Sequence, residues 1–359
     1  MEFLLKIPSK ALNFIVAART KLRAGYHFKS EWWIAVITPL VLIATRIRAG
    51  HNNKRTRTAL LFLALATPIS GLGQNVALIY DESSRYQRGF VETLSSQLST
   101  TAVHLKHINS VSLSTDALKK DLPDIIISLN DQSSRQLIVS KLQTTTFHAL
   151  TTLSRSRHIA PCLPDCLTVL PNHLFFVLDQ PVARQLSLIK LINPAIKNIG
   201  LIVTEHSSPY WLPQQIKPHA YSINKYITEA KSIRYQIDTI SQSSDAILAV
   251  ADTDIYNAST LSQILLTSYR YKTPVIGFSS GFIKAGALSG TISTLQQLAQ
   301  HLAECLRLLE SADAEKKRSL IYPKYFKVVS NRGVAKSLNL HFPSDQKLTS
   351  ILSGNETTR

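Results

Sequence analysis

The chain has 359 residues, of which 45% are hydrophobic and 18% are charged, so it is long enough for two domains with cores of their own and too weakly charged for a disordered protein. Its formal net charge is +17, yet residues 1–74 hold eleven Lys and Arg against two Glu, which is more than half of the excess. The remaining basic residues are scattered singly, and this pattern argues against the basic groove of a nucleic-acid-binding protein.

The first segment with a clear pattern is a predicted signal peptide at 52–74. A basic region at 54–57 precedes an apolar run at 59–66, and glycines occupy the −3 and −1 positions of a cleavage site before Gln74. The protein is therefore expected to be exported to the periplasm. No Cys follows the cleavage point, so no lipoprotein anchor is expected.

A second apolar run lies upstream, at 32–45. It is shorter than the ~20 residues that a membrane-spanning helix needs. Two alternatives stay open: either translation starts further downstream and residues 1–50 are not made, or this run lies in the membrane interface and tethers the protein. We favour the first, although Met1 is the only methionine and a later start would need another codon.

From residue 75 onward, short β-branched runs alternate with longer amphipathic stretches. One face of the predicted helix at 88–99 carries Phe90, Val91, Leu94 and Leu98. Strands are expected at 75–80, 102–108, 124–130 and 147–153, and helices at 88–99, 114–122 (capped by Ser114) and 133–143. Alternation of this kind predicts a parallel sheet with helices on both faces.

Three cysteines lie further along the chain, at positions 162, 166 and 305. Export to an oxidising compartment makes a local disulfide between Cys162 and Cys166 one interpretation. The other is that all three are small buried apolar residues. A metal site is not expected, because there is no second cysteine pair and no histidine cluster nearby.

The second half of the chain repeats the alternation. Strands are expected at 173–181, 198–203, 245–252 and 274–281, and helices at 182–192, 228–241 and 260–271. Two successive runs of about a hundred residues each predict two doubly wound α/β lobes.

Polar side chains at the ends of the predicted strands are the candidate ligand contacts, because ligands of open parallel sheets bind outside the carboxyl ends of the strands. These candidates are Ser83, Asn130, Asp179, Gln180, Asp252, Tyr256, Ser279 and Ser280. Asp252 suits an ammonium or hydroxyl group of a ligand, or else caps the following helix. Tyr256 either stacks on a ligand or packs in the core. Asp254 and Asn257 are expected to start the next helix.

A serine hydrolase is the alternative from the enzyme class. The sequence GFSSG around Ser279 matches the G-x-S-x-G nucleophile motif, and Asp313 and His341 have the chain order of the other two triad members. The helix that must follow the nucleophile is disfavoured by Gly286 and Gly290. No dinucleotide, P-loop or zinc-protease motif is present, so we predict a protein that is not an enzyme and needs no cofactor or metal.

Three stretches carry a resemblance to a known family: 175–203 (FFVLDQPVARQL and onward), 245–306 (DAILAVADTDIYN and onward) and 322–340 (YPKYFKVVSNRGVAKSLNL). They resemble the extracytoplasmic substrate-binding components of ABC transporters with the type I periplasmic binding protein fold, in particular the branch grouped with tryptophan/tyrosine-type binding proteins. The resemblance implies that a small polar or aromatic ligand is held between two Rossmann-like lobes. It implies an ABC permease as partner or, alternatively, a membrane sensor or signalling protein.

The resemblance also implies a domain organisation. Three crossovers are expected near 179–180, 280–281 and 311. The segments are then 1–73 (N-terminal extension and signal peptide), 75–179 with 281–310 (lobe 1), 180–280 with 311–343 (lobe 2) and 344–359 (C-terminal tail). Asp252 and the residues after it, with the loop after 274–278, are expected on the ligand-facing side of lobe 2. Many relatives carry other polar residues there, and the insert with Cys162 and Cys166 is unusual, so the identity of the ligand does not follow.

Overall fold

A computed structural model of the chain describes residues 73–205, 207–208, 221–229, 231–309 and 318–357. Residues 71–359 form one compact unit, distinct from the preceding residues, and every described helix and strand lies within it. The first strand begins at Gln74, the residue after the predicted cleavage site. The predicted signal peptide and the apolar run at 32–45 fall outside the described residues, and none of the described helices is long and apolar enough to span a membrane.

The first lobe is built on a sheet of six parallel strands in the order β11-β5-β4-β3-β1-β2. The strands are β1 (Gln74–Tyr80), β2 (Val103–Asn109), β3 (Ile125–Ser128), β4 (Thr145–Thr151), β5 (His173–Val177) and β11 (Leu320–Ile321). The central strands β3 and β5 are buried at every position. Helices therefore cover both faces, as the alternating pattern predicts.

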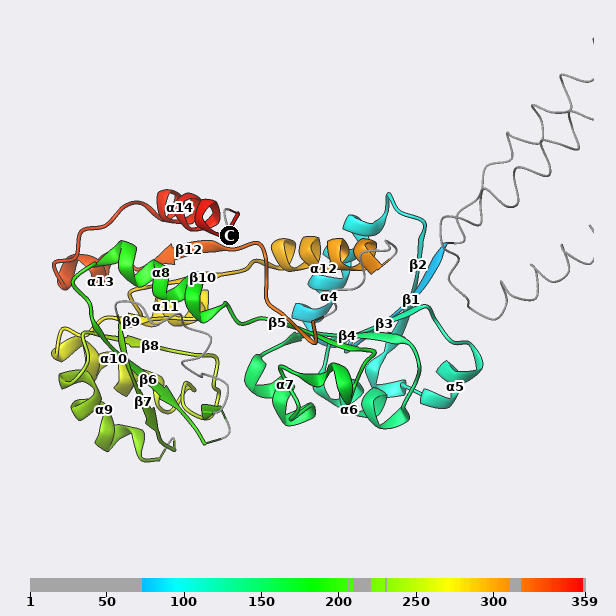
Figure 1. The fold of residues 1–359 in the computed structure, drawn as a ribbon, viewed down its shortest axis with the longest axis horizontal. Helices are drawn as coiled ribbons and strands as arrows, with labels where there is room; N and C mark the ends of the chain where they lie inside the picture. The colour runs from blue at the N-terminus through cyan, green and yellow to red at the C-terminus, as the bar shows by residue number, and fades with distance from the viewer. Residues whose placement is uncertain (1–72, 206, 209–220, 230, 310–317, 358–359) are drawn as a thin grey trace, which may run out of the picture. The chain divides into compact units, whose positions relative to one another are not determined.

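The helices of the first lobe are α4 (Arg85–Leu98), α5 (Thr115–Lys120), α6 (Asp131–Ser140), α7 (Leu153–Ile159) and α12 (Leu295–Leu309). The predicted apolar face of α4 is confirmed, because Phe90, Val91, Leu94 and Leu98 are all buried. This face packs beside α12 on one side of the sheet, and α5, α6 and α7 lie on the other (Figure 1).

The second lobe is built on another six-stranded sheet, in the order β12-β10-β9-β8-β6-β7. All its pairs are parallel except that of β12 with β10. Its strands are β6 (Asn198–Val203), β7 (Ser222–Ile227), β8 (Ala246–Leu248), β9 (Val275–Ile276), β10 (Ser289–Ile292) and β12 (Lys327–Ser330). The strands expected at 245–252 and 274–281 are thus much shorter than predicted, because the chain turns as soon as it leaves the sheet.

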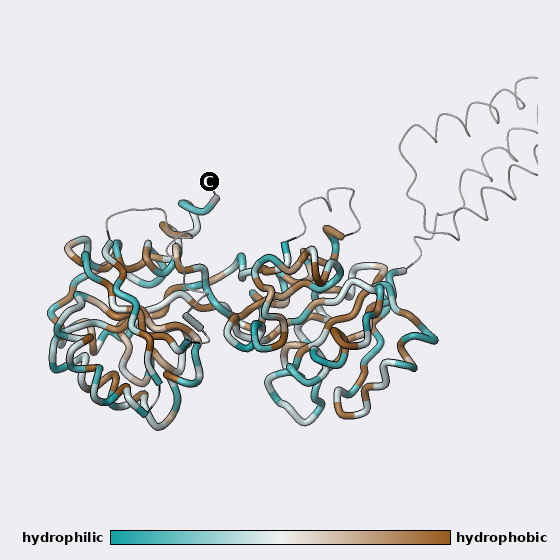
Figure 2. Tube along the Cα trace, turned by 60° about the horizontal axis from the view of Figure 1, so that its bottom comes forward, coloured by the Kyte–Doolittle hydropathy of each residue, from teal (hydrophilic) through white to brown (hydrophobic). Residues whose placement is uncertain are grey.

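The helices of the second lobe are α8 (Val182–Ile192), α9 (Ile233–Gln242), α10 (Leu261–Arg270), α11 (Ser280–Ala285), α13 (Arg332–Ser337) and α14 (Asp345–Thr357). One continuous apolar cluster joins the helices to the sheet, and Figure 2 shows the hydrophobic segments gathered inside each lobe. Within the expected C-terminal tail at 344–359, residues 345–357 form α14, and the buried Leu348 and Leu352 attach this helix to the second lobe.

The chain crosses between the sheets three times: after β5, after β10 and after β11. The first crossing, at 178–181, lies where one was expected. The crossovers expected near 280–281 and 311 are displaced, because α11 and β10 still belong to the second lobe and β11 to the first. A Cβ on Gly290 would stand 2.1 Å from the carbonyl oxygen of Gly277, so a glycine is needed for β10 to lie this close to the chain after β9.

Hydrogen bonds connect the three crossings. Gln180 in the first donates through Nε2 to Ser293 Oγ in the second (2.9 Å). Ser293 Oγ in turn donates to the carbonyl oxygen of Tyr325 in the third (2.6 Å). Arg184, in the first turn of α8, donates through Nη1 to Gln180 Oε1 (2.6 Å) and to the carbonyl oxygen of Pro323 (2.9 Å). The hinge between the lobes is therefore an ordered polar network.

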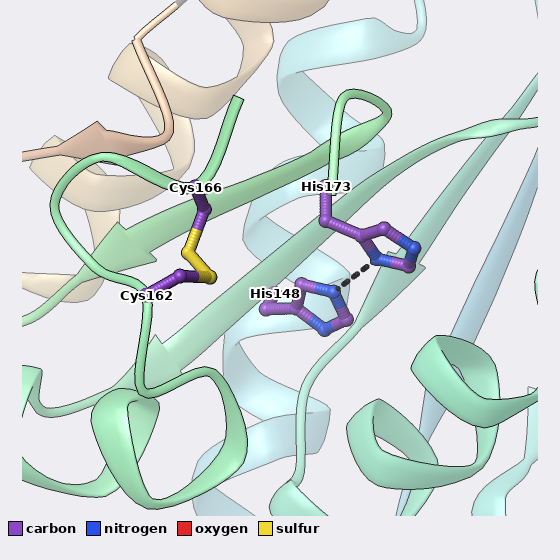
Figure 3. The surroundings of a disulfide bond; sticks show 4 residues. All are labelled: His148, Cys162, Cys166 and His173. Atoms are coloured by element: carbon purple, nitrogen blue, oxygen red, sulfur yellow. Dashed lines mark hydrogen bonds between the residues drawn. A yellow bond between two sulfur atoms is a disulfide. The ribbon is translucent and has the colours of Figure 1, made fainter. Parts of the chain in front are cut away.

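Cys162 and Cys166 form a disulfide in the loop between α7 and β5 (Figure 3). This decides between the two interpretations of these cysteines, and the loop also contains a cis peptide bond between Leu163 and Pro164. Cys305 in α12 is a half-buried free thiol, and burial raises its pKa to about 11. A thiol with a raised pKa is a poor nucleophile, and Cys305 packs against the apolar cluster of the first lobe.

Two histidines lie side by side inside the first lobe, near the disulfide (Figure 3). The Nε2 atom of His148 lies 2.9 Å from Nδ1 of His173, and the two rings are nearly parallel, with centroids 5.2 Å apart. The ring of His148 also stacks on Phe175, with ring centroids 4.6 Å apart. Burial lowers the pKa of both histidines, and that of His148 is well below its ordinary value.

We expect the unfolding free energy to fall as the pH is lowered below about 6.5, because the unfolded chain then binds protons that the buried pair cannot accept. His148→Phe keeps a ring against Phe175 and removes the titrating group, so urea unfolding near pH 7.5 and near pH 5 should show a smaller difference for this variant than for the wild type. The exposed His341 provides the matched control. An equal change in pH dependence for His341→Phe would contradict this assignment.

Candidate ligand site at the carboxyl edges of the sheets

Two candidate residues lie at the carboxyl edge of the first sheet, after the neighbouring strands β1 and β3. Ser83 is exposed, and its N–H and hydroxyl both donate to Asp81 Oδ1 (2.8 and 2.6 Å). Asn130 caps α6, where its Oδ1 accepts from the N–H of Ser133 (2.9 Å). The structure brings Ser83 and Asn130 to the same edge of the sheet, where each side chain hydrogen-bonds to residues two or three positions away.

Ser279 and Ser280 lie at the carboxyl edge of the second sheet, after β9. Ser279 caps α11 by accepting from the N–H of Phe282 (3.2 Å), and Ser280 is exposed. The expectation that no helix follows Ser279 is wrong, because α11 occupies the six residues before Gly286. A hydrolase nucleophile sits on a strained turn, whereas Ser279 has extended backbone (φ −148°, ψ 155°).

The other two members of the supposed triad are Asp313 and His341. Within the described part of the chain, no histidine hydrogen-bonds to Ser279, and Asp313 lies outside the described residues. Ser279 is the N-cap of α11, and its hydroxyl lies near the carboxyl edge of the second sheet.

Asp252 is 1% exposed and joins two strand ends. Its Oδ2 accepts hydrogen bonds from the hydroxyls of Thr204 and Ser207, which follow β6. Its Oδ1 accepts from the N–H of Asp254 (3.0 Å). Asp252 is therefore a buried acceptor that fixes the loop after β8 to the loop after β6, and the N-cap of α10 is Thr260 instead.

The segment after Asp252 also differs from expectation. α10 begins at Leu261, after Thr260, so neither Asp254 nor Asn257 is its N-cap. Asn257 instead closes a turn, in which its Oδ1 accepts from the N–H of Ser259 (3.0 Å). A series of turns replaces the expected early helix start because the side chains in this segment bond to their own backbone.

Tyr256 is 7% exposed and belongs to an aromatic cluster in the second lobe. Its ring makes edge contacts with Phe278 and Phe282, at centroid distances of 5.8 and 5.5 Å. Its hydroxyl is buried and has no hydrogen-bond partner among the described residues. Burial and the nearby charge of Asp252 raise the pKa of this phenol, so Tyr256 is a neutral core residue rather than an open stacking surface.

Asp179 and Gln180 line a hollow next to the first crossing, together with Val182, Gln185, Leu248 to Ala251 and Phe278. The hollow has a volume of about 20 Å³, which is room for about one water molecule. The sequence-based list missed Gln185 and Phe278, although Phe278 lies directly before the candidate Ser279 in the predicted strand at 274–281. A larger hollow of about 520 Å³ lies at the opposite edge of the second sheet, beside the ends of α8, α9 and α10, where the carboxyl-edge rule expects no ligand.

Gln180 and Asp179 differ in how their polar atoms are used. Both amide atoms of Gln180 are bonded within the hinge. Asp179 is 5% exposed, and its Oδ2 accepts from the N–H of Leu153 at the start of α7 (2.6 Å). Burial raises the pKa of Asp179 to about 7. Strongly shifted groups in a hollow are candidates for a functional role.

No protein-family model matches the sequence, and no curated protein matches it. Solved structures do match. The ligand-free, open structure of a substrate-binding protein with adhesive properties from Clostridium difficile covers 76% of this chain and 97% of its own, with 14% identity and a TM-score of 0.54. The chain has the fold of type I periplasmic binding proteins. Its two α/β lobes and three crossings are the elements of this fold, and they confirm the predicted fold class.

Two further solved structures match the chain with TM-scores of 0.49. One is the ABC domain from Streptococcus pneumonia in complex with L-Trp, at 14% identity, covering 77% of this chain and 98% of its own. The other is a conserved domain protein from Vibrio cholerae, at 17% identity with the same coverage. We take the fold from the first match alone, and sequence identities this low carry no ligand over to the chain.

Proposed function

We propose that the chain is an extracytoplasmic solute-binding protein that holds a small ligand beside its hinge and delivers it to an ABC permease. The observation that carries this proposal is the hollow at the first crossing, which combines a buried carboxyl group with an aromatic ring at the carboxyl edge of the second sheet. Closure of the two lobes on the ligand would need no covalent step, since contacts from both lobes stabilise the closed state.

In this proposal Asp179 and Phe278 contact the ligand directly. Ser280 offers an exposed hydroxyl at the second sheet, and Ser83 and Asn130 lie at the edge of the first. The remaining candidates support the site without touching the ligand. Gln180 hydrogen-bonds within the hinge, and Asp252 joins two loops. Tyr256 packs against Phe278, and Ser279 caps α11.

Export and permease coupling belong to the same proposal. The predicted signal peptide supports export, and the Cys162–Cys166 disulfide fits an oxidising compartment. L-Trp, which is bound by the pneumococcal neighbour, is the first compound to test. Sugars, nucleosides and small organic acids follow, because the fold alone does not choose between these classes.

A thermal-shift screen of residues 74–359 tests the proposal, because this segment holds every described element. At 100-fold excess over its Kd, a true ligand stabilises the folded state by about 2.7 kcal/mol, which raises Tm by several degrees. Phe278→Ala should abolish this shift relative to its own unliganded Tm, while Tyr235→Ala, an aromatic residue 72% exposed on α9, should keep it. The proposal fails if no compound shifts the wild type or if Phe278→Ala responds as fully as the wild type does.

A further inference from the structure

A hollow of about 520 Å³ lies at the amino edge of the second sheet, opposite the edge that carries the hinge hollow. Its walls are the segments that lead into the neighbouring strands β6, β8 and β9, at 193–196, 241–245 and 271–273. The volume is within the range of about 300–1,000 Å³ that is usual for small-molecule sites. Because the solute of an open parallel sheet binds at the carboxyl edge, a ligand held here would be a second one.

Most of the lining of this hollow is polar. Ala195 and Ile196 are apolar, and the other lining residues carry a hydroxyl, amide, carboxylate or ammonium group. Ser241 is 2% exposed, and its hydroxyl has no hydrogen-bond partner among the described residues. Buried hydroxyls are normally satisfied, so this wall favours a ligand that both donates and accepts hydrogen bonds.

Two polar side chains at the rim are held in place by hydrogen bonds within the protein. Asp245 Oδ2 accepts from the N–H groups of Lys197 and Asn198, both at 2.8 Å. Gln242 donates through Nε2 to the hydroxyl of Tyr271 (2.9 Å), which connects the end of α9 to the end of α10. Asp245 and Gln242 are exposed, and each has a second oxygen that can accept from a ligand hydroxyl.

The charges around the hollow favour a neutral ligand. Helices α8, α9 and α10 all end here, and the C-termini of helices carry partial negative charge. Asp245 adds a full negative charge, because hydrogen bonds from the backbone, chiefly from the N–H of Asn198, lower its pKa. Lys272 is positive and exposed at the rim. The helix ends and Asp245 therefore oppose an anion, and Lys272 opposes a cation.

Tyr271 supplies an apolar surface next to these polar groups. It is 40% exposed. A pyranose ring has an apolar C–H face that packs on an aromatic ring, and its hydroxyls both donate and accept hydrogen bonds. Among the described residues that line the hollow, Tyr271 alone is aromatic, so the flat faces of a nucleobase would be covered on one side only. The lining therefore fits a sugar better than a nucleobase.

We propose that this hollow is a second ligand site, and that its ligand is a neutral saccharide. Tyr271 packs against the C–H face of a sugar ring, and Gln242, Asp245 and Lys272 hydrogen-bond to its hydroxyls. The site is at the opposite edge of the sheet from the hinge hollow, so it binds the sugar whether or not a solute is present there. This inference goes beyond the proposed function and does not depend on it.

The test is isothermal titration of residues 74–359 with matched pairs of sugars: glucose and glucuronate, galactose and galacturonate, mannose and mannuronate. We expect at least one neutral sugar to bind with a Kd on the order of 1 mM or tighter. The uronate of the same pair should bind roughly 3- to 10-fold more weakly, because its carboxylate meets Asp245 and the helix ends. The proposal is wrong if no neutral sugar binds, or if the uronate binds as tightly.

Amide hydrogen exchange of the wild-type protein locates the sugar without any substitution. At a saturating sugar concentration, exchange should slow at 241–245 and 271–273 and stay unchanged at the first crossing, 178–181. Slower exchange at 178–181 alone would overturn the proposal, because the sugar is then bound at the hinge.

Tyr271→Ala provides the second arm. It removes the apolar surface and should weaken the neutral sugar roughly 3- to 10-fold, whereas Tyr271→Phe keeps the ring and should lose less. Tyr269→Ala is the matched control, because Tyr269 is 47% exposed on the same helix and does not line the hollow. If Tyr271→Ala and Tyr269→Ala both bind the sugar as the wild type does, the site is not at this hollow.

Phe278→Ala separates this proposal from the proposed function. The substitution should leave the affinity of the sugar at the second site unchanged. A sugar whose binding is lost in Phe278→Ala and kept in Tyr271→Ala is the solute of the hinge site, so the solute-binding function stands and the second site is wrong. If sugar binding depends on Tyr271 and no compound responds to Phe278→Ala, the second site stands and the proposed function fails.

Discussion

Replacing Arg184 with Met is expected to lower the unfolding free energy by about 3 kcal/mol, the lower end of the range for breaking a buried ion pair. The side chain of Arg184 is 4% exposed, and its Nε and Nη2 donate to the two carboxylate oxygens of Glu356 in α14, each at 2.6 Å. Its guanidinium also covers the ring of Phe326 at 4.0 Å. The lower end applies because Glu356 is 39% exposed and regains water when its partner is removed.

A double-mutant cycle isolates the ion pair from the other contacts of Arg184. Glu356→Gln alone and with Arg184→Met should give a coupling energy of about 1–3 kcal/mol by denaturant unfolding. Arg332→Met is the matched control, because Arg332 is 47% exposed and pairs with Asp345 at a similar distance, 2.6 Å; exposed pairs contribute about 0–1 kcal/mol. If Arg184→Met and Arg332→Met lose equal amounts of unfolding free energy, burial does not strengthen the Arg184–Glu356 ion pair.

The Arg184 network has a consequence for the lobes. It ties α14, near the end of the described chain, to the first and third crossings through Gln180 and Pro323. Loss of Arg184 is therefore expected to loosen the hinge as well as the fold. Amide hydrogen exchange should become faster at the crossing segments 178–181 and 322–326 in Arg184→Met, while the core strand β3 keeps its protection.

Asp252→Ala is expected to cost about 3 kcal/mol or more in the absence of any ligand. The substitution leaves buried donors on Thr204 and Ser207 without their acceptor and removes the bond from the N–H of Asp254. Each buried donor left unsatisfied costs about 1–3 kcal/mol. The loop after β8 would also lose its connection to the loop after β6.

Urea unfolding of unliganded protein measures this effect, with Asp254→Ala as the control. Asp254 is exposed, and its substitution should change stability by no more than about 0.5 kcal/mol. If Asp252→Ala and Asp254→Ala are equally stable, the assignment of Asp252 as a buried hydrogen-bond acceptor that joins the two loops is wrong. Loss of ligand binding in Asp252→Ala would not by itself identify a ligand contact, because the same substitution disturbs a loop at the sheet edge.

Most of the fold could be predicted from the sequence, and particular elements show why. Helix α8 and strand β6 have the predicted bounds, and the apolar face of α4 is the predicted one. The bounds and faces of these segments are set by an apolar periodicity, a helix cap or a proline, all of which lie within a few residues. The local sequence is therefore sufficient to predict these elements. The alternation of such segments predicted two parallel α/β sheets.

The later crossings could not be predicted in the same way. β10 and β11 have four and two residues, too few to carry a periodic pattern. β10 belongs to the second sheet because Ser289 to Ile292 pair with 327–330, and β11 belongs to the first because it pairs with β5. These pairings join segments far apart in the chain, so only the tertiary structure decides them.

The same distinction between local sequence and tertiary structure applies to the candidate site. The sequence by itself predicted candidates that lie after the strands, at the carboxyl edges of the sheets, although it placed the ends of β8 and β9 too far along the chain. Only the tertiary structure decided how each of them is used. Asp252 is hydrogen-bonded to residues 45 and 48 positions away and Gln180 to one 113 positions away. Such partners meet only when the sheets and the crossings are packed together.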